Sequence, residues 1–154
     1  MSCDPANPLK MPNLIPAKVL DICPSPYGHA VFVRSAEKVF VIYVDRARGA
    51  ALQYAFKGEK ASRPLSHEFA LGMLDALDCS VKNAVIYREK DGTFFTSLGV
   101  VMKNELGCKI AEVDGRPSDV LAAALSAGAP IFVEAGLLER LPDMGEAYKK
   151  IKGD

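Results

Sequence analysis

The chain has 154 residues, 49% of them hydrophobic, and its 19 basic and 19 acidic side chains give a formal net charge of zero. This length and apolar content suit one compact domain, because two independent cores would each be small and marginal. The neutral balance excludes a protein that holds nucleic acid through bulk positive charge alone, although a local basic patch could still bind it. Apolar runs stay well below the roughly 18 residues that span a bilayer, and the polar, Pro-rich start lacks a signal-peptide core. We therefore expect a cytoplasmic protein with no membrane partner.

The first third of the chain is rich in strand signals. Residues 1–14 are Pro-rich and are interpreted as an irregular lead-in. β-Branched and aromatic residues then gather in short runs, the last two of which are separated by a polar loop typical of a hairpin. Strands are predicted over residues 15–23, 30–33 and 39–44.

Two helices are expected next. Residues 49–56 have the alanines and large apolar residues of a buried helix, closed by Gly58. A second helix is predicted over residues 66–78, with Ser66 as its cap and Glu68 in the first turn, where the helix dipole favours an acid. Because its apolar side chains cover more than one face, we expect this helix to be largely buried.

The rest of the chain alternates between strands and helices. The dipeptide Asp91-Gly92 is a strong hairpin signal, and Pro117 and Gly128 stand where a helix begins and ends. A charged tail follows from residue 142 to residue 154. Strands are predicted over residues 81–87, 93–102, 109–113 and 131–133, and helices over residues 117–127 and 135–141.

These elements predict an α+β fold, with a mixed or antiparallel sheet and packed helices in a single domain over residues 15–141. Two segments also echo one another, since Val41-Ile-Tyr-Val-Asp45 and Ile110-Ala-Glu-Val-Asp114 each precede an Ala-rich helix. A duplicated strand–helix unit and coincidence remain open as explanations. A glycine-rich phosphate loop is missing from the sequence, which argues against nucleotide-dependent chemistry of the familiar kinds.

Two polar clusters carry the candidate chemistry, Arg63-Pro-Leu-Ser-His-Glu68 and Asp114-Gly-Arg-Pro-Ser-Asp119. Each places an arginine and a hydroxyl at the start of a predicted helix, where unpaired N–H groups favour an anion. The expected phosphate-binding residues are Arg63, Arg116 and Ser118. The candidate catalytic residues are His67, Glu68, Asp114 and Asp119, with His67 able to transfer a proton. The three carboxylates Glu68, Asp114 and Asp119 are also candidate ligands for a hard divalent cation such as Mg²⁺ or Mn²⁺.

A structural interpretation of both clusters stands beside this one. Ser66 and Asp119 are ordinary capping and first-turn residues, and a neighbouring arginine could pair with Asp114 or Glu68 merely to fix a loop. In that case the same residues stabilise the fold and bind nothing.

The two clusters resemble motifs of the bifunctional nuclease domain family. The segment 63–68 is similar to its R-P-L-T-H-D motif, and Asp91-Gly-Thr-Phe-Phe95 is similar to D-G-T-F-Y. The segment 114–119 is similar to D-A-R-P-S-D and is followed by Ala129-Pro-Ile-Phe-Val133, similar to A-P-I-F/Y-V. The resemblance implies an α+β domain, usually a homo-oligomer, from a family described as hydrolysing both DNA and RNA.

The chain departs from the family pattern in one stretch. Where the family commonly has I-G-x-x-E-A, this sequence has Val44-Asp-Arg-Ala-Arg-Gly49, which puts Asp45 at the glycine and Arg48 at the glutamate. The leading hypothesis is a metal-assisted nuclease that acts on nucleic acid. Its activity requires that the glutamate replaced by Arg48 is not needed for catalysis. The alternatives are a non-catalytic binding or oligomeric assembly module, and an enzyme acting on a small phosphorylated or carboxylated metabolite.

Overall fold

The structure, a computed structural model, describes residues 13–153, so most of the expected lead-in lies outside the described residues. Seven strands and five helices follow one another along this part of the chain. The strands are β1 (Leu14–Ser25), β2 (Gly28–Ser35), β3 (Lys38–Val44), β4 (Cys79–Lys90), β5 (Thr93–Asn104), β6 (Gly107–Gly115) and β7 (Ile131–Glu134). The helices are α1 (Arg46–Lys57), α2 (Ser66–Ala76), α3 (Pro117–Ala127), α4 (Ala135–Arg140) and α5 (Gly145–Lys152).

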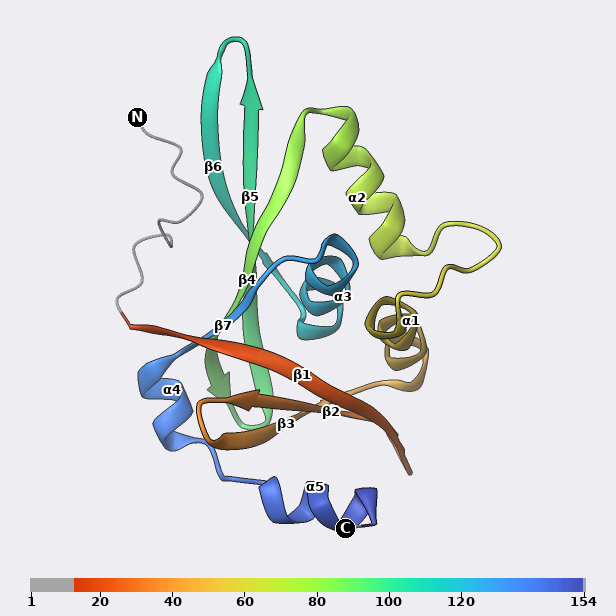
Figure 1. Ribbon diagram of the computed structural model, residues 1–154, viewed down its shortest axis with the longest axis vertical. Helices are drawn as coiled ribbons and strands as arrows, with labels where there is room; N and C mark the ends of the chain where they lie inside the picture. Colours follow the sequence, from red (N-terminus) through yellow and green to blue (C-terminus); the bar gives the residue numbers. More distant parts are fainter. Residues whose placement is uncertain (1–12, 154) are drawn as a thin grey trace.

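All seven strands form one sheet in the order β3-β2-β1-β7-β4-β5-β6. Two antiparallel three-stranded meanders flank the short strand β7, as Figure 1 shows. β7 runs antiparallel to β1 and parallel to β4, so the sheet is mixed. The predicted α+β class with a mixed sheet is therefore confirmed.

The two halves of the sheet have the same strand–helix order. The meander β1-β2-β3 leads into α1, and the meander β4-β5-β6 leads into α3. Both helices end on a glycine in the left-handed region, Gly58 at φ 69° and Gly128 at φ 66°, which only glycine adopts at little cost. The internal echo in the sequence thus corresponds to a repeated topology.

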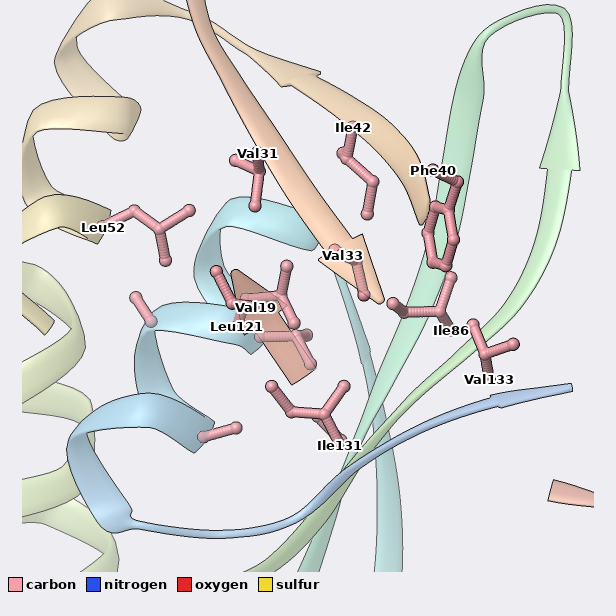
Figure 2. Packing of buried hydrophobic residues seen from close by; sticks show 14 of the residues in the cluster. Val19, Val31, Val33, Phe40, Ile42, Leu52, Ile86, Leu121, Ile131 and Val133 are labelled. Atoms are coloured by element: carbon pink, nitrogen blue, oxygen red, sulfur yellow. The ribbon is translucent and has the colours of Figure 1, made fainter. Parts of the chain in front are cut away.

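The core lies between the sheet and the helices α1 and α3. Figure 2 shows Leu52 of α1 and Leu121 of α3 in one cluster with Val19 and Val31 of the first meander, Ile86 of the second meander and Ile131 of β7. Phe40 of β3 stacks on Phe94 of β5 with ring centroids 5.9 Å apart, so the two meanders also meet through their aromatic side chains. Because one core takes residues from both halves, the repeated units depend on each other for burial.

The carboxyl-terminal helices cover other parts of the sheet (Figure 1). Lys38 Nζ donates to the carbonyl oxygens of Leu138 and Leu141, 2.6 and 2.9 Å away, and so holds the end of α4. Helix α5 occupies the charged tail, and its Tyr148 ring lies 5.0 Å from the ring of Phe32. Within residues 13–153, none of the helices is long and apolar enough to cross a membrane.

Helix α1 begins three residues earlier than the sequence predicted, at Arg46 instead of Gly49. Asp45 is its N-cap and accepts a hydrogen bond from the backbone N–H of Arg48 at 2.9 Å. This cap satisfies one of the donors that a helix start leaves unpaired. The polar run Arg46-Ala-Arg48 therefore belongs to the first turn and not to a loop.

Helix α2 differs from its prediction in two respects. Its N-cap is Leu65, so the expected cap at Ser66 is wrong. The expected burial is also wrong, because His67 alone is buried among its eleven residues, while Phe69, Met73 and Leu77 just beyond its end are 64%, 49% and 67% exposed. These three side chains follow one another at four-residue spacing and form an exposed apolar stripe on one side of α2.

Candidate functional site

The amino-terminal ends of α1, α2 and α3 meet around one cavity of about 410 Å³, here called the cleft. Both polar clusters of the sequence contribute to it, and α1 adds a third wall. The residues that line the cleft are Asp45, Ala47, Arg48, Ala51, Leu65, Ser66, His67, Arg116, Ser118, Asp119 and Ala122.

The α1 wall carries an ion pair between Arg48 and Asp45. The backbone N–H and the guanidinium of Arg48 lower the pKa of Asp45, and the positive charge of Arg116 adds to that effect. Arg116 thus acts on Asp45 from the α3 side of the cleft. Both Asp45 and Arg48 were missing from the residues expected at the site, although an N-cap Asp followed three residues later by Arg was a usable signal.

The α3 wall carries a second pair, with Arg116 Nε donating to Asp119 Oδ2 at 2.9 Å. Ser118 lies between them and is buried. The predicted phosphate ligands Arg116 and Ser118 and the predicted acid Asp119 are thus neighbours in one wall. In the described part of the chain neither α2 nor α3 has a side-chain cap, and the first-turn N–H groups of α2 are left for water or a ligand. At the start of α3 only the Ser118 N–H is left, because Pro117 has no N–H and the Asp119 N–H donates to the Arg116 carbonyl oxygen at 3.0 Å.

His67 lies between the cleft and a second cavity of about 310 Å³, here called the side cavity, and lines both. Ser66 and Asp119 also line both. The His67 side chain is only 6% exposed, and Glu68 Oε1, 4.0 Å from His67 Nε2, is too distant for a hydrogen bond. Among residues 13–153, no hydrogen bond reaches this imidazole. Burial lowers the pKa of His67 below 6.5, so the ring is neutral at neutral pH.

Asp114 lines the side cavity, but its carboxylate is already engaged. Tyr87 donates its hydroxyl to Asp114 Oδ1 at 2.8 Å, and this hydrogen bond raises the pKa of Tyr87 above its usual 10. The Tyr87 ring lies 6.4 Å from that of Phe95, and the Arg88 guanidinium lies 5.2 Å from the centroid of the Phe95 ring. Sequence reasoning missed Tyr87, which only the pairing of β4, β5 and β6 brings near Asp114.

Two predicted site residues lie apart from the cleft. Arg63 is exposed in the loop before α2 and lines neither the cleft nor the side cavity. Glu68 lines a third cavity, of about 260 Å³, near the carboxyl-terminal ends of α1 and α3. Its Oε1 is buried with no hydrogen-bond partner among the described residues. Successive helix residues point about 100° apart, so His67 and Glu68 face different surroundings.

The sequence profile of the bifunctional nuclease domain matches residues 31–142 of the chain. This range includes all three walls of the cleft. The chain belongs to the bifunctional nuclease domain family. The family predicted from the two polar clusters is therefore confirmed, and the bifunctional nuclease domain takes in every element from β3 to α4.

Two curated relatives of this bifunctional nuclease domain come from Mycobacterium tuberculosis, one from strain CDC 1551 / Oshkosh and one from strain H37Rv. Each is described as an uncharacterized protein and is 31% identical to the chain over 104 residues. The alignment covers 68% of this chain and 59% of each relative, so the chain spans less than two thirds of the length of these relatives. Their names assign no activity.

Proposed function

We propose that the chain hydrolyses phosphodiester bonds of DNA or RNA in the cleft. The observation that carries this proposal is that both polar clusters line one cavity, the first through Ser66 and the buried, neutral His67 and the second through Arg116, Ser118 and Asp119. Membership of the bifunctional nuclease domain family supports nucleic acid as the partner. Arg116 and Ser118 bind the phosphate, and Asp119 positions Arg116.

The chemistry of the α3 wall suits a phosphodiester group. A guanidinium can donate two hydrogen bonds to one phosphate, and the uncapped start of α3 adds the Ser118 N–H and partial positive charge. Exposed ion pairs such as Arg116–Asp119 add only about 0–1 kcal/mol to stability. A phosphate can therefore replace Asp119 as the partner of Arg116 at small cost.

His67 is the group proposed to move a proton. Because its pKa is lowered by burial, it is unprotonated at neutral pH and can accept a proton from water. The water oxygen then attacks phosphorus, the bond from phosphorus to the leaving oxygen breaks, and that oxygen takes a proton from solvent. Asp114, which lines the side cavity with His67, is proposed to order water there.

The described residues present no ready-made metal centre. Across residues 13–153, no three His, Cys, Asp or Glu side chains are grouped closely enough to hold one. Glu68 faces another cavity, and one oxygen of Asp114 is bound to Tyr87. No step of the proposed reaction is therefore routed through Mg²⁺ or Mn²⁺.

The test is cleavage of end-labelled single- and double-stranded DNA and RNA by the purified chain, in EDTA, in Mg²⁺ and in Mn²⁺. We expect cleavage in EDTA that falls at least tenfold in His67→Gln and Arg116→Gln. Arg46→Gln is the matched control, since Arg46 is exposed on α1 and does not line the cleft. The proposal is rejected if no cleavage occurs under any of the three conditions, or if all variants are equally active. Cleavage that occurs only with a cation rejects the metal-free route.

A second candidate function, assembly of identical chains, is favoured by the exposed stripe on α2. Large apolar side chains in a row on one helix face are typical of a protein interface. An antiparallel crossing of two α2 helices centred on Met73 would place Phe69 opposite Leu77 of the partner subunit. It would also bring the basic Arg63 end of one helix to the acidic Asp78 end of the other.

Self-association through α2 is tested by sedimentation equilibrium. Met73→Glu should shift a homo-oligomer toward the monomer, because a charge would be buried at the centre of the contact. Ile151→Glu, on the exposed side of α5, is the matched control and should leave the mass unchanged. A wild-type monomer at high concentration would refute this interface without affecting the nuclease proposal.

A further inference from the structure

The cleft holds one arginine–aspartate pair from each half of the fold, Asp45–Arg48 on α1 and Arg116–Asp119 on α3. We propose that it accepts two neighbouring phosphate groups of one ligand, one on Arg48 and the other on Arg116. This inference rests on the proposed function and adds a second phosphate position to it. Asp45 and Asp119 hold the two guanidinium groups in place when the cleft is empty.

Both arginines belong to the same site. Arg48 lines the 410 Å³ cavity from α1, and Arg116 lines it from the start of α3. The charge of Arg116 also helps to lower the pKa of Asp45, the carboxylate that Arg48 binds. A ligand bound to Arg116 therefore lies within the electrostatic reach of the Asp45–Arg48 pair.

In both ion pairs the arginine can exchange its aspartate for a phosphate. The side chains of Arg48 and Arg116 are 41% and 60% exposed, and exposed pairs of this kind are weak. A guanidinium binds phosphate with two charge-assisted hydrogen bonds, which is a stronger arrangement. Replacing each carboxylate by phosphate therefore requires no rearrangement of α1 or α3.

Two arginines in one cavity favour a ligand with two phosphates. Such a ligand engages both guanidinium groups at once, and the second contact forms within a complex that already exists, so it costs little additional entropy. A ligand with one phosphate makes only one of these contacts and should bind more weakly.

His67 also lines this cavity. Its imidazole is 6% exposed and receives no hydrogen bond from residues 13–153, and its ring nitrogens are not among the fully buried polar atoms that lack a partner, so they reach solvent. A phosphate oxygen between Arg48 and Arg116 would take the place of water beside this ring.

Two ligand sources share this chemistry, namely successive phosphates of a nucleic-acid strand and a nucleoside diphosphate. Binding is measured by calorimetry in EDTA, with thymidine 5′-monophosphate, thymidine 3′,5′-bisphosphate and thymidine 5′-diphosphate as probes. We expect at least one two-phosphate probe to bind about tenfold tighter than the monophosphate. Preference for the bisphosphate indicates a strand, and preference for the diphosphate indicates a small metabolite.

Variants separate the two positions. Arg48→Gln should lower affinity for the preferred two-phosphate probe about tenfold and leave monophosphate binding unchanged, whereas Arg116→Gln should weaken both. Asp45→Asn keeps a good N-cap but removes the competing charge, so it should strengthen binding. Arg46→Gln is the control, and circular dichroism confirms that each variant folds.

Equal binding of all three probes, or an Arg48→Gln variant that behaves like Arg46→Gln, overturns the inference. The outcome is distinct from that of the cleavage assay because no turnover is measured. Selective binding without hydrolysis keeps the two-phosphate site and removes the nuclease proposal. Hydrolysis by the wild type, together with an Arg48→Gln variant that binds the probes as the wild type does, keeps the nuclease proposal and removes the two-phosphate site.

Discussion

Gly49 is where a single methyl group should disturb the packing of α1 on the sheet. A Cβ at this position would lie 2.1 Å from His29 Nδ1, 2.4 Å from its Cγ and 2.7 Å from its Cβ. His29 is buried on β2, and its Cβ cannot move without the strand. Overpacking of this kind costs about 1–3 kcal/mol, against a gain of roughly 0.5–1 kcal/mol from alanine in a helix. We therefore expect Gly49→Ala to lower the free energy of unfolding by about 1–2 kcal/mol.

Urea unfolding measures this change, and Gly72→Ala on α2 is the matched control. An added Cβ at Gly72 meets no atom within 4 Å in the described structure, so that variant should gain roughly 0.5–1 kcal/mol. Low protein concentration keeps self-association through α2 out of the comparison. The double variant His29→Ala/Gly49→Ala should recover part of the loss, because the clashing ring is gone. A Gly49→Ala protein as stable as Gly72→Ala, or no recovery in the double variant, would refute the clash.

Three further predictions concern single side chains. Burial lowers the pKa of His67, so as pH falls below 6.5 the unfolded chain binds a proton at this residue before the folded chain does. The wild type should therefore lose more free energy of unfolding between pH 7 and pH 5 than His67→Gln does, as measured by parallel urea titrations. Asp114→Asn should lower the raised pKa of Tyr87, seen as one of the five tyrosines ionising earlier in an absorbance titration; an unchanged titration would contradict the hydrogen bond. Lys38→Met should lower the free energy of unfolding by about 1–3 kcal/mol and speed amide hydrogen exchange in α4, because it removes the ammonium group that binds the carbonyl oxygens at that helix end. Unaltered exchange in α4 would argue against this cap.

The sequence predicted best the elements whose ends are fixed by local chemistry. The helix over residues 117–127 has the predicted bounds, because Pro117 can only begin a helix and Gly128 readily takes the left-handed conformation that ends one. Asp91-Gly92 likewise forms the predicted turn with positive φ at both residues. The start of α1 was missed because residues 45–48 were left between the strand predicted over residues 39–44 and the helix predicted from residue 49, although the Asp45 side chain caps the helix.

What escaped prediction depends on contacts between distant segments. The apolar residues of α2 indicated burial, but the position of neighbouring elements decides whether one side of a helix meets the core, and Phe69 remains 64% exposed. The sequence placed Arg116, Ser118 and Asp119 together correctly because they share one helix turn. It did not reveal that Arg48, 68 positions away from Arg116, faces them, because only the sheet order brings α1 beside α3.

The position of β7 in the chain has a consequence for synthesis. This four-residue strand joins the two meanders of the sheet, yet it comes after all six of the strands it unites. On the ribosome, the earlier strands can form local hairpins as they emerge. The continuous sheet can form only after Glu134 has left the exit tunnel. A nascent chain stalled before Ile131 should therefore contain two separate meanders whose strands β1 and β4 each have an unpaired edge, accessible to chaperones and proteases.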